Sequence, residues 1–134
     1  MPELAALIAA ASLGAMLFFS AVVAPSLFKV YPEVEAGRFL RLVFPHYFQI
    51  NAALAAIAAI VAASLVPSLI LLASAAAMFA VKVYAIPIVN IARDAMLAGD
   101  ATAAARFALW HRGTVVVNVA EMVALVVAIV LLVF

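Results

Sequence analysis

The 134-residue chain contains no cysteine, only four glycines, and few charges, with seven basic and six acidic side chains. Without cysteine the protein has no disulfide, thiolate zinc site, iron–sulfur cluster or cysteine nucleophile. A net charge of +1 provides no basic field for phosphate, which excludes a nucleic-acid partner. Four scattered glycines form no phosphate-binding loop. These absences favour a protein that is not an enzyme.

Hydrophobic residues, in contrast, make up 72% of the chain. Soluble domains have about 45–50% apolar residues, and a domain of this size keeps much of its surface in contact with solvent. No charge occurs between Glu3 and Lys29 or between Arg41 and Lys82. A membrane span needs about 20 apolar residues, so the second stretch is long enough for two spans, with a break at Pro67. The sequence therefore predicts four helices, over residues 3–30, 34–66, 68–97 and 102–134.

Lipid offers no partner for free backbone groups, so the spans must be helical, and short connections make neighbouring helices antiparallel. We predict an all-α integral membrane four-helix antiparallel bundle, with residues 1–134 as one transmembrane domain. The first helix is expected to be a retained span, because its leader carries Glu3 and no basic residue. The positive-inside rule places the basic end in the cytoplasm and both termini on the non-cytoplasmic side, as in a multi-pass protein of a bacterial inner membrane. The basic residues at that end are Lys29, Arg38, Arg41, Arg93, Arg106 and Arg112.

A weak internal repeat is visible between the two halves of the chain. Ala15-Met16 and Pro25 match Ala77-Met78 and Pro87. A second match pairs Arg38-Phe39 and Asn51 with Arg106-Phe107 and Asn118, at a slightly different offset. Two repeated helical hairpins would suit a four-helix bundle, whereas chance similarity between apolar helices is the alternative.

Polar residues are rare in the spans, and those of the last helix form one stripe. At about 100° per residue, His111, Thr114, Asn118 and Glu121 fall within a narrow arc, which should face the bundle interior. Polar residues on the other helices are expected to face this stripe. The predicted ligand- or ion-binding residues are Tyr47, Asn51, Lys82, Asn90, His111, Thr114, Asn118 and Glu121.

Lys82 and Glu121 both lie near the middle of their spans. An isolated charge there costs about 2.5–3.5 kcal/mol on insertion scales, so the two are predicted to form an intramembrane ion pair, unless one is neutralised. One interpretation is a proton or cation relay, or an anchor for a polar ligand. The other is a clasp between helices with no chemistry.

The only two histidines, His46 and His111, are candidate metal ligands. Two imidazoles across a four-helix bundle can hold a b-type haem, whereas histidines at the membrane interface are the alternative. Met16, Met78 and Met122 lie on three different helices, each near the midplane of the membrane. Thioethers suit Cu(I), but methionine more often fills gaps between helices, which is the interpretation we favour.

Short motifs in the first and last helices suggest a family. Helix one contains GAMLFFSAVVAPSLF, and helix four contains RFALWHRGTVVVN, with Phe107, His111, Thr114 and Asn118 at characteristic spacing. This pattern resembles the transmembrane protein 205-like family of small four-helix membrane proteins, although Trp110 stands where that family typically has leucine. The resemblance implies an integral membrane protein with a transport- or resistance-type role.

Three functions remain open from the sequence. The first is binding or transport of a small ligand or ion in the polar bundle interior. The second is a b-type haem or metal protein that uses His111, with or without His46, and the third is a structural subunit of a larger membrane complex. The expected partners are the lipid bilayer and a small molecule or ion, and homo-oligomerisation is left open.

Overall fold

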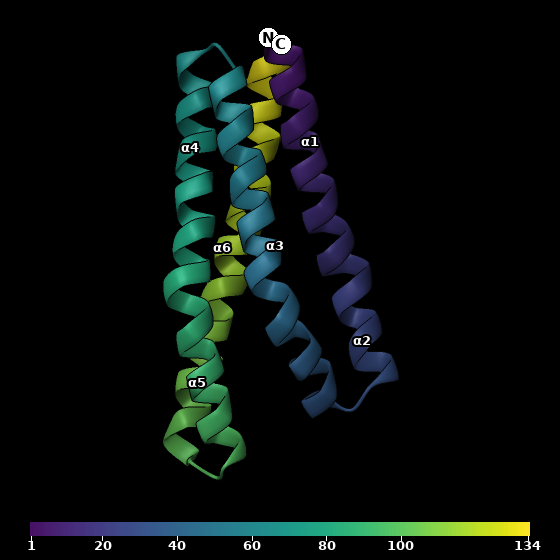
Figure 1. Cartoon of the computed structure of the whole chain (residues 1–134), viewed down its shortest axis with the longest axis vertical. Coiled ribbons are helices and arrows are strands. Elements are labelled where there is room, and N and C mark those ends of the chain that lie inside the picture. The colour runs from purple at the N-terminus through teal and green to yellow at the C-terminus, as the bar shows by residue number, and fades with distance from the viewer.

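The computed structural model describes residues 1–134 and consists of four long helical segments (Figure 1). All four are long and apolar enough to cross a membrane. The predicted all-α four-helix bundle is therefore confirmed. The first segment comprises α1 (Pro2–Phe18), the π-helical turn η1 (Phe19–Val23) and α2 (Ala24–Val30), and the second is α3 (Glu33–Val61). The third segment comprises α4 (Leu65–Ala80), the π-helical turn η2 (Val81–Ala85) and α5 (Ile86–Leu97), and the fourth is α6 (Ala101–Val133).

The turn between the second and third segments lies earlier than predicted. The break was expected at Pro67, but α3 ends at Val61 and the chain reverses at Ala63, which has φ 54°. Pro67 instead lies in the first turn of α4. Its missing N–H is harmless there, because the first turn of a helix has no intrahelical acceptor for that group. The Ser68 hydroxyl donates a hydrogen bond to the carbonyl of Ala59 at 2.9 Å and closes the turn.

Both Pro25 and Pro87 follow a short π-helical turn. The residues four positions before them, Ala21 and Val83, lie in the middle of η1 and η2. A proline ring clashes with the carbonyl at that position in an α-helix, and the wider π turn relieves this contact. The two π turns are 62 positions apart, the same offset as Met16 and Met78, and this correspondence is what a two-hairpin repeat predicts.

The half of the bundle nearest the two termini, which we call the closed half, is tightly packed. There α1 packs against α3 and α6, and α4 packs against the same two helices. Alanines with no exposed surface lie at these interfaces, and small side chains let backbones approach closely. Examples are Ala5, Ala9, Ala55, Ala58 and Ala128.

The other half, which we call the open half, contains α2, the first part of α3, α5 and the first part of α6. In Figure 1, α2 and the adjoining part of α3 lean away from α5 and α6. The backbones of η1 and α2 do not come close to the backbone of α6. Pro45 lies within α3 in this half and removes one backbone hydrogen bond from the helix. All four helices are thus joined along one half of their length, whereas in the other half α2 and the start of α3 diverge from α5 and α6, which stay packed together.

Candidate functional site

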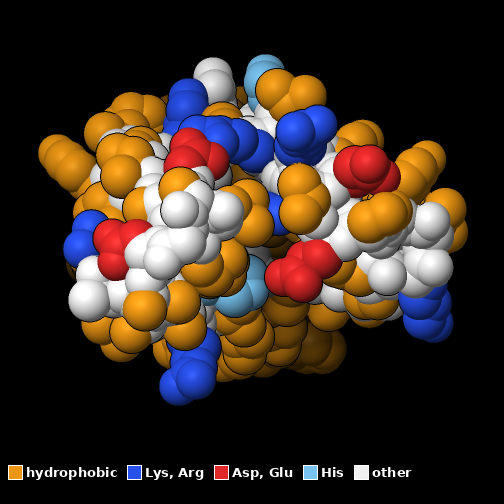
Figure 2. All heavy atoms as spheres, turned by 90° about the horizontal axis from the view of Figure 1, so that it is seen from below, with side chains coloured by type: hydrophobic (Ala, Val, Ile, Leu, Met, Phe, Trp, Pro, Cys, Tyr) orange, Lys and Arg blue, Asp and Glu red, His pale blue; other side chains and the backbone are white.

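A cleft occupies the open half of the bundle. Viewed from this end, charged side chains gather around a hollow that leads into the molecule (Figure 2). The hollow has two parts, an inner chamber of about 450 Å³ and an outer chamber of about 580 Å³. Both volumes are typical of small-molecule sites, which span roughly 300–1,000 Å³. The chambers adjoin one another, because both are lined by Phe28, Leu40, Phe44 and His111, and we refer to the two together as the cleft.

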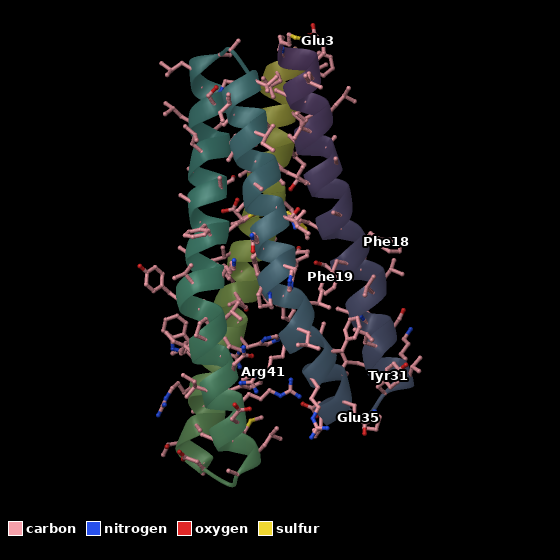
Figure 3. All side chains as sticks on the ribbon, viewed as in Figure 1. Glu3, Phe18, Phe19, Tyr31, Glu35 and Arg41 are labelled. Atoms are coloured by element: carbon pink, nitrogen blue, oxygen red, sulfur yellow. The ribbon has the colours of Figure 1, made fainter.

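The inner chamber is mostly apolar, since 13 of its 17 lining residues are hydrophobic. One wall is a cluster of aromatic rings from η1 and α3. The Phe19 ring centroid lies 4.9 Å from that of Tyr47 and 5.7 Å from that of Phe44. Phe19 points toward α3, whereas its neighbour Phe18 points away from the bundle (Figure 3). Rings of this size keep the helices further apart than the alanines of the closed half do.

A hydrogen-bond network borders the inner chamber where the closed half begins. The Tyr47 hydroxyl donates to Asn118 Oδ1 at 2.7 Å, and Asn118 Nδ2 donates to Ser20 Oγ at 3.2 Å. Asn51 Nδ2 donates to the carbonyl of Tyr47, and Asn51 Oδ1 accepts from the Ser12 hydroxyl at 2.7 Å. The network joins three of the four segments. Because its members bond mainly to one another, they present few free polar groups to a ligand.

The outer chamber contains polar groups that are not used in this way. Asn90 and Arg93 line it from α5, and His111 lines it from α6. The His111 ring stacks on Phe107 with centroids 5.5 Å apart and an interplanar angle of 11°. Thr114 donates to the carbonyl of His111 and is therefore satisfied within its own helix.

Arginine side chains connect α3 to α5 across the outer chamber. Arg41 extends from α3 (Figure 3) and forms two hydrogen bonds to the carboxylate of Asp94, at 2.7 and 2.9 Å. Arg93 Nη2 donates to the backbone carbonyl of Glu33 at 3.0 Å. The Arg93 guanidinium lies against Gly37, where a larger residue would collide with it. The Arg41–Asp94 pair is the only salt bridge, so Arg93 has no carboxylate partner.

The chain matches the family described as a domain of unknown function (DUF4149) over residues 7–134. It belongs to the DUF4149 family. No curated protein matches the chain, and no solved structure does. The comparisons thus give no support for the resemblance to the transmembrane protein 205-like family and show an uncharacterised family. The four candidate membrane-spanning helices indicate a multi-pass membrane protein.

The predicted ion pair of this DUF4149 protein is not formed. Lys82 Nζ donates to Gln49 Oε1 at 2.6 Å, on the side where η2 meets α3. Glu121 is buried, with only 7% of its surface exposed, and the Ser74 side chain lies against its carboxyl group. Its Oε2 has no hydrogen-bond partner. The prediction was wrong because it rested on the matched depth of the two residues, whereas Lys82 lies inside a π turn, which shifts the helical register, and bonds to α3 instead.

The two histidines of the DUF4149 protein do not converge on one site. His46 is exposed, and its Nδ1 lies 3.0 Å from the carbonyl of Leu42 in its own helix. Of the two, only His111 lines the cleft. The structure therefore provides no paired imidazoles for a haem. Met16 and Met78 are fully buried in the core, and Met122 lines the inner chamber.

Of the eight predicted site residues, the cleft contains five, namely Tyr47, Asn90, His111, Thr114 and Asn118. Asn51, Lys82 and Glu121 lie outside it. The sequence analysis named Arg93 only among the basic residues at one end of the bundle and not among the binding residues. A signal was present, because Arg93 is four residues from Val89 and three from Asn90, and all three line the outer chamber.

Proposed function

We propose that this DUF4149 protein binds a small molecule with a largely apolar body in the cleft of its open half. The observation that carries the proposal is the cleft of two adjoining chambers, apolar at its inner end and polar at its mouth. Ligand sites of soluble and membrane proteins share this composition, with many apolar side chains and a few polar groups that orient the ligand.

Access from two directions supports the proposal. The outer chamber opens among the charged residues of the end that the positive-inside rule assigns to the cytoplasm. The inner chamber is lined by residues of η1, α2 and α6, and the backbones of η1 and α2 do not come close to that of α6, which leaves a gap between them. A compound dissolved in the inner leaflet could enter through this lateral gap. We therefore favour a carrier or receptor for membrane-soluble compounds in the bacterial inner membrane.

Native mass spectrometry with a neutral single-chain lipid, monopalmitin, tests the proposal. Ala24 is half-buried and lines the inner chamber, so Ala24→Phe should fill part of it. Ala120 is exposed on α6 and lies outside both chambers, so Ala120→Phe is the matched control. We expect saturable binding of one monopalmitin per chain in the wild type and the control, and loss of binding in Ala24→Phe. Equal binding by the two variants would contradict the proposal.

A further inference from the structure

We infer that the ligand of the cleft is an anionic single-chain amphiphile, whose chain lies in the inner chamber and whose carboxylate or phosphate binds Arg93 in the outer chamber. The inference rests on the proposed function and names the ligand class. It depends on how the charges are distributed along the wall of the outer chamber.

The apolar inner chamber cannot select a membrane-soluble ligand. Lipid tails are as apolar as the walls of the chamber, so moving an acyl chain from the bilayer into it gains no hydrophobic free energy. Close packing and polar contacts must therefore provide the selectivity. The network of Tyr47, Asn118 and Ser20 carries no charge and its members bond mainly to one another, so the charged outer chamber is the place where a headgroup is recognised.

The charges of the outer chamber favour an anion. Its charged lining residues are Arg41, Arg93 and Glu33. The carboxylate of Asp94 compensates Arg41 through both of its oxygens. The carboxylate of Glu33 lies in the first turn of α3, where the helix dipole stabilises it. Arg93 is half-buried and forms no salt bridge, although its charge also acts on the neighbouring Asp94 carboxylate.

The geometry of Arg93 suits a headgroup with two or three oxygens. It donates through Nη2 to the carbonyl of Glu33, so the N–H groups on Nη1 and Nε are free of intramolecular hydrogen bonds. A guanidinium binds carboxylate and phosphate through paired hydrogen bonds, which are stronger than hydrogen bonds between neutral groups. Contact with Gly37 and the bond to Glu33 hold the guanidinium in place before a ligand arrives.

Two further donors surround the same space. Asn90 precedes Arg93 by one helical turn, so both face the outer chamber from α5. His111 faces it from α6, with its ring plane held by stacking on Phe107. His111 also lines the inner chamber, so it lies where the headgroup and the chain of an amphiphile would join.

Competition between three palmitoyl ligands tests the inference by native mass spectrometry of the full chain in neutral detergent. Palmitate carries a carboxylate, palmitoyl lysophosphatidic acid carries a phosphate, and monopalmitin is neutral. At a pH where both acids are ionised, we expect the wild type to prefer at least one anion over monopalmitin by about tenfold or more, as expected for a charged hydrogen-bond pair. The preferred anion tells us which headgroup is the better ligand.

Arg93→Gln should remove that preference, while monopalmitin binds as before. Arg106→Gln is the matched control, because Arg106 is an exposed cation of the same end that lines neither chamber. If Arg93→Gln does not fold, as judged by thermal unfolding, Asn90→Leu tests the same headgroup site. It should weaken binding of the anion alone.

The outcomes separate the inference from the proposed function. If no ligand binds in a saturable, one-to-one manner, the proposed function is wrong. If monopalmitin and both anions bind equally, or if Arg106→Gln lowers binding of the anions as much as Arg93→Gln does, only the inference about an anionic headgroup is overturned.

Discussion

The closed and open halves of the bundle contain the same four segments and differ in the side chains between them. In the closed half, fully buried alanines such as Ala9, Ala55 and Ala58 lie between the helices. In the open half, the rings of Phe19, Phe44 and Tyr47 occupy the equivalent space between the first segment and α3. Because dispersion packing is the main attraction between helices in lipid, small residues close a bundle and large rings hold it apart.

Backbone features add to the difference. Pro25, Pro45 and Pro87 all lie in the open half or at its border, and two of them follow π turns. Each proline removes a backbone hydrogen bond and allows the helix to bend. The open half is then joined between α3 and α5 mainly by arginine contacts. A cleft at this end is therefore a consequence of where the sequence places alanine, aromatic residues and proline.

The largest difference in the free energy of unfolding should come from replacing one leucine by alanine in each half. Leu125 is fully buried in the closed half, whereas Leu40 already borders both chambers. We expect Leu125→Ala to lower the free energy of unfolding by about 2 kcal/mol, the low end for buried leucine, because lipid removes the hydrophobic part of the cost. Leu40→Ala should cost clearly less, since a cavity is already there. Unfolding in mixed detergent measures both, and equal losses would contradict the comparison.

A smaller effect is expected at the border between the halves. Tyr47→Phe removes the hydroxyl that bonds to Asn118. Hydrogen bonds between membrane helices average about 0.6 kcal/mol and reach about 1.7, so we expect a loss of about 1 kcal/mol in the free energy of unfolding. Tyr84→Phe is the matched control, because Tyr84 is 69% exposed and outside the network. If both variants unfold alike, the network does not stabilise the border.

Lys82 and Glu121 test whether charges couple across the bundle. Since Lys82 bonds to Gln49 and Glu121 lies against Ser74, the effects of Lys82→Met and Glu121→Gln on the free energy of unfolding should add in the double variant. We expect a coupling energy below about 0.5 kcal/mol, the usual limit for independent sites. A coupling of several kcal/mol would show that the two charges pair in the membrane after all.

The smallest effect on stability is expected at the turn between α5 and α6, where the open half ends. Hydrogen bonds from the Thr102 hydroxyl, and from the N–H groups of Ala103 and Thr102, hold the pKa of Asp100 below its ordinary value. Asp100 caps α6, so its carboxylate stabilises the fold above the unfolded pKa of about 3.9, and this contribution is lost as the pH falls through the lower folded pKa.

Thermal unfolding of the wild type and Asp100→Asn measures this effect. Asparagine also caps helices but does not titrate. We expect the wild type to lose Tm relative to Asp100→Asn as the pH falls from about 6 to about 3. A Tm difference that does not change with pH would contradict the role of the carboxylate. The closed half contains no such cap, so acid should affect this end first.

Much of the fold could be predicted from the sequence. The four spans, their order and the clustering of basic residues at one end follow from uncharged stretches of about 20 residues or more. The inward polar stripe of α6 was partly predicted, since His111, Thr114 and Asn118 do line the cleft. The break at Pro67 was misplaced, because proline is as compatible with a first helical turn as with a loop.

By itself, the sequence determined that the helices are surrounded by lipid, how many helices there are and at which end the charges gather. These properties depend on composition summed over whole segments. The tertiary structure alone decided the partners of single polar groups. Lys82 bonds to Gln49, Glu121 lies against Ser74, and Arg93 lines a cleft without forming a salt bridge. Those choices depend on π turns and on distances between helices, which helical periodicity does not contain.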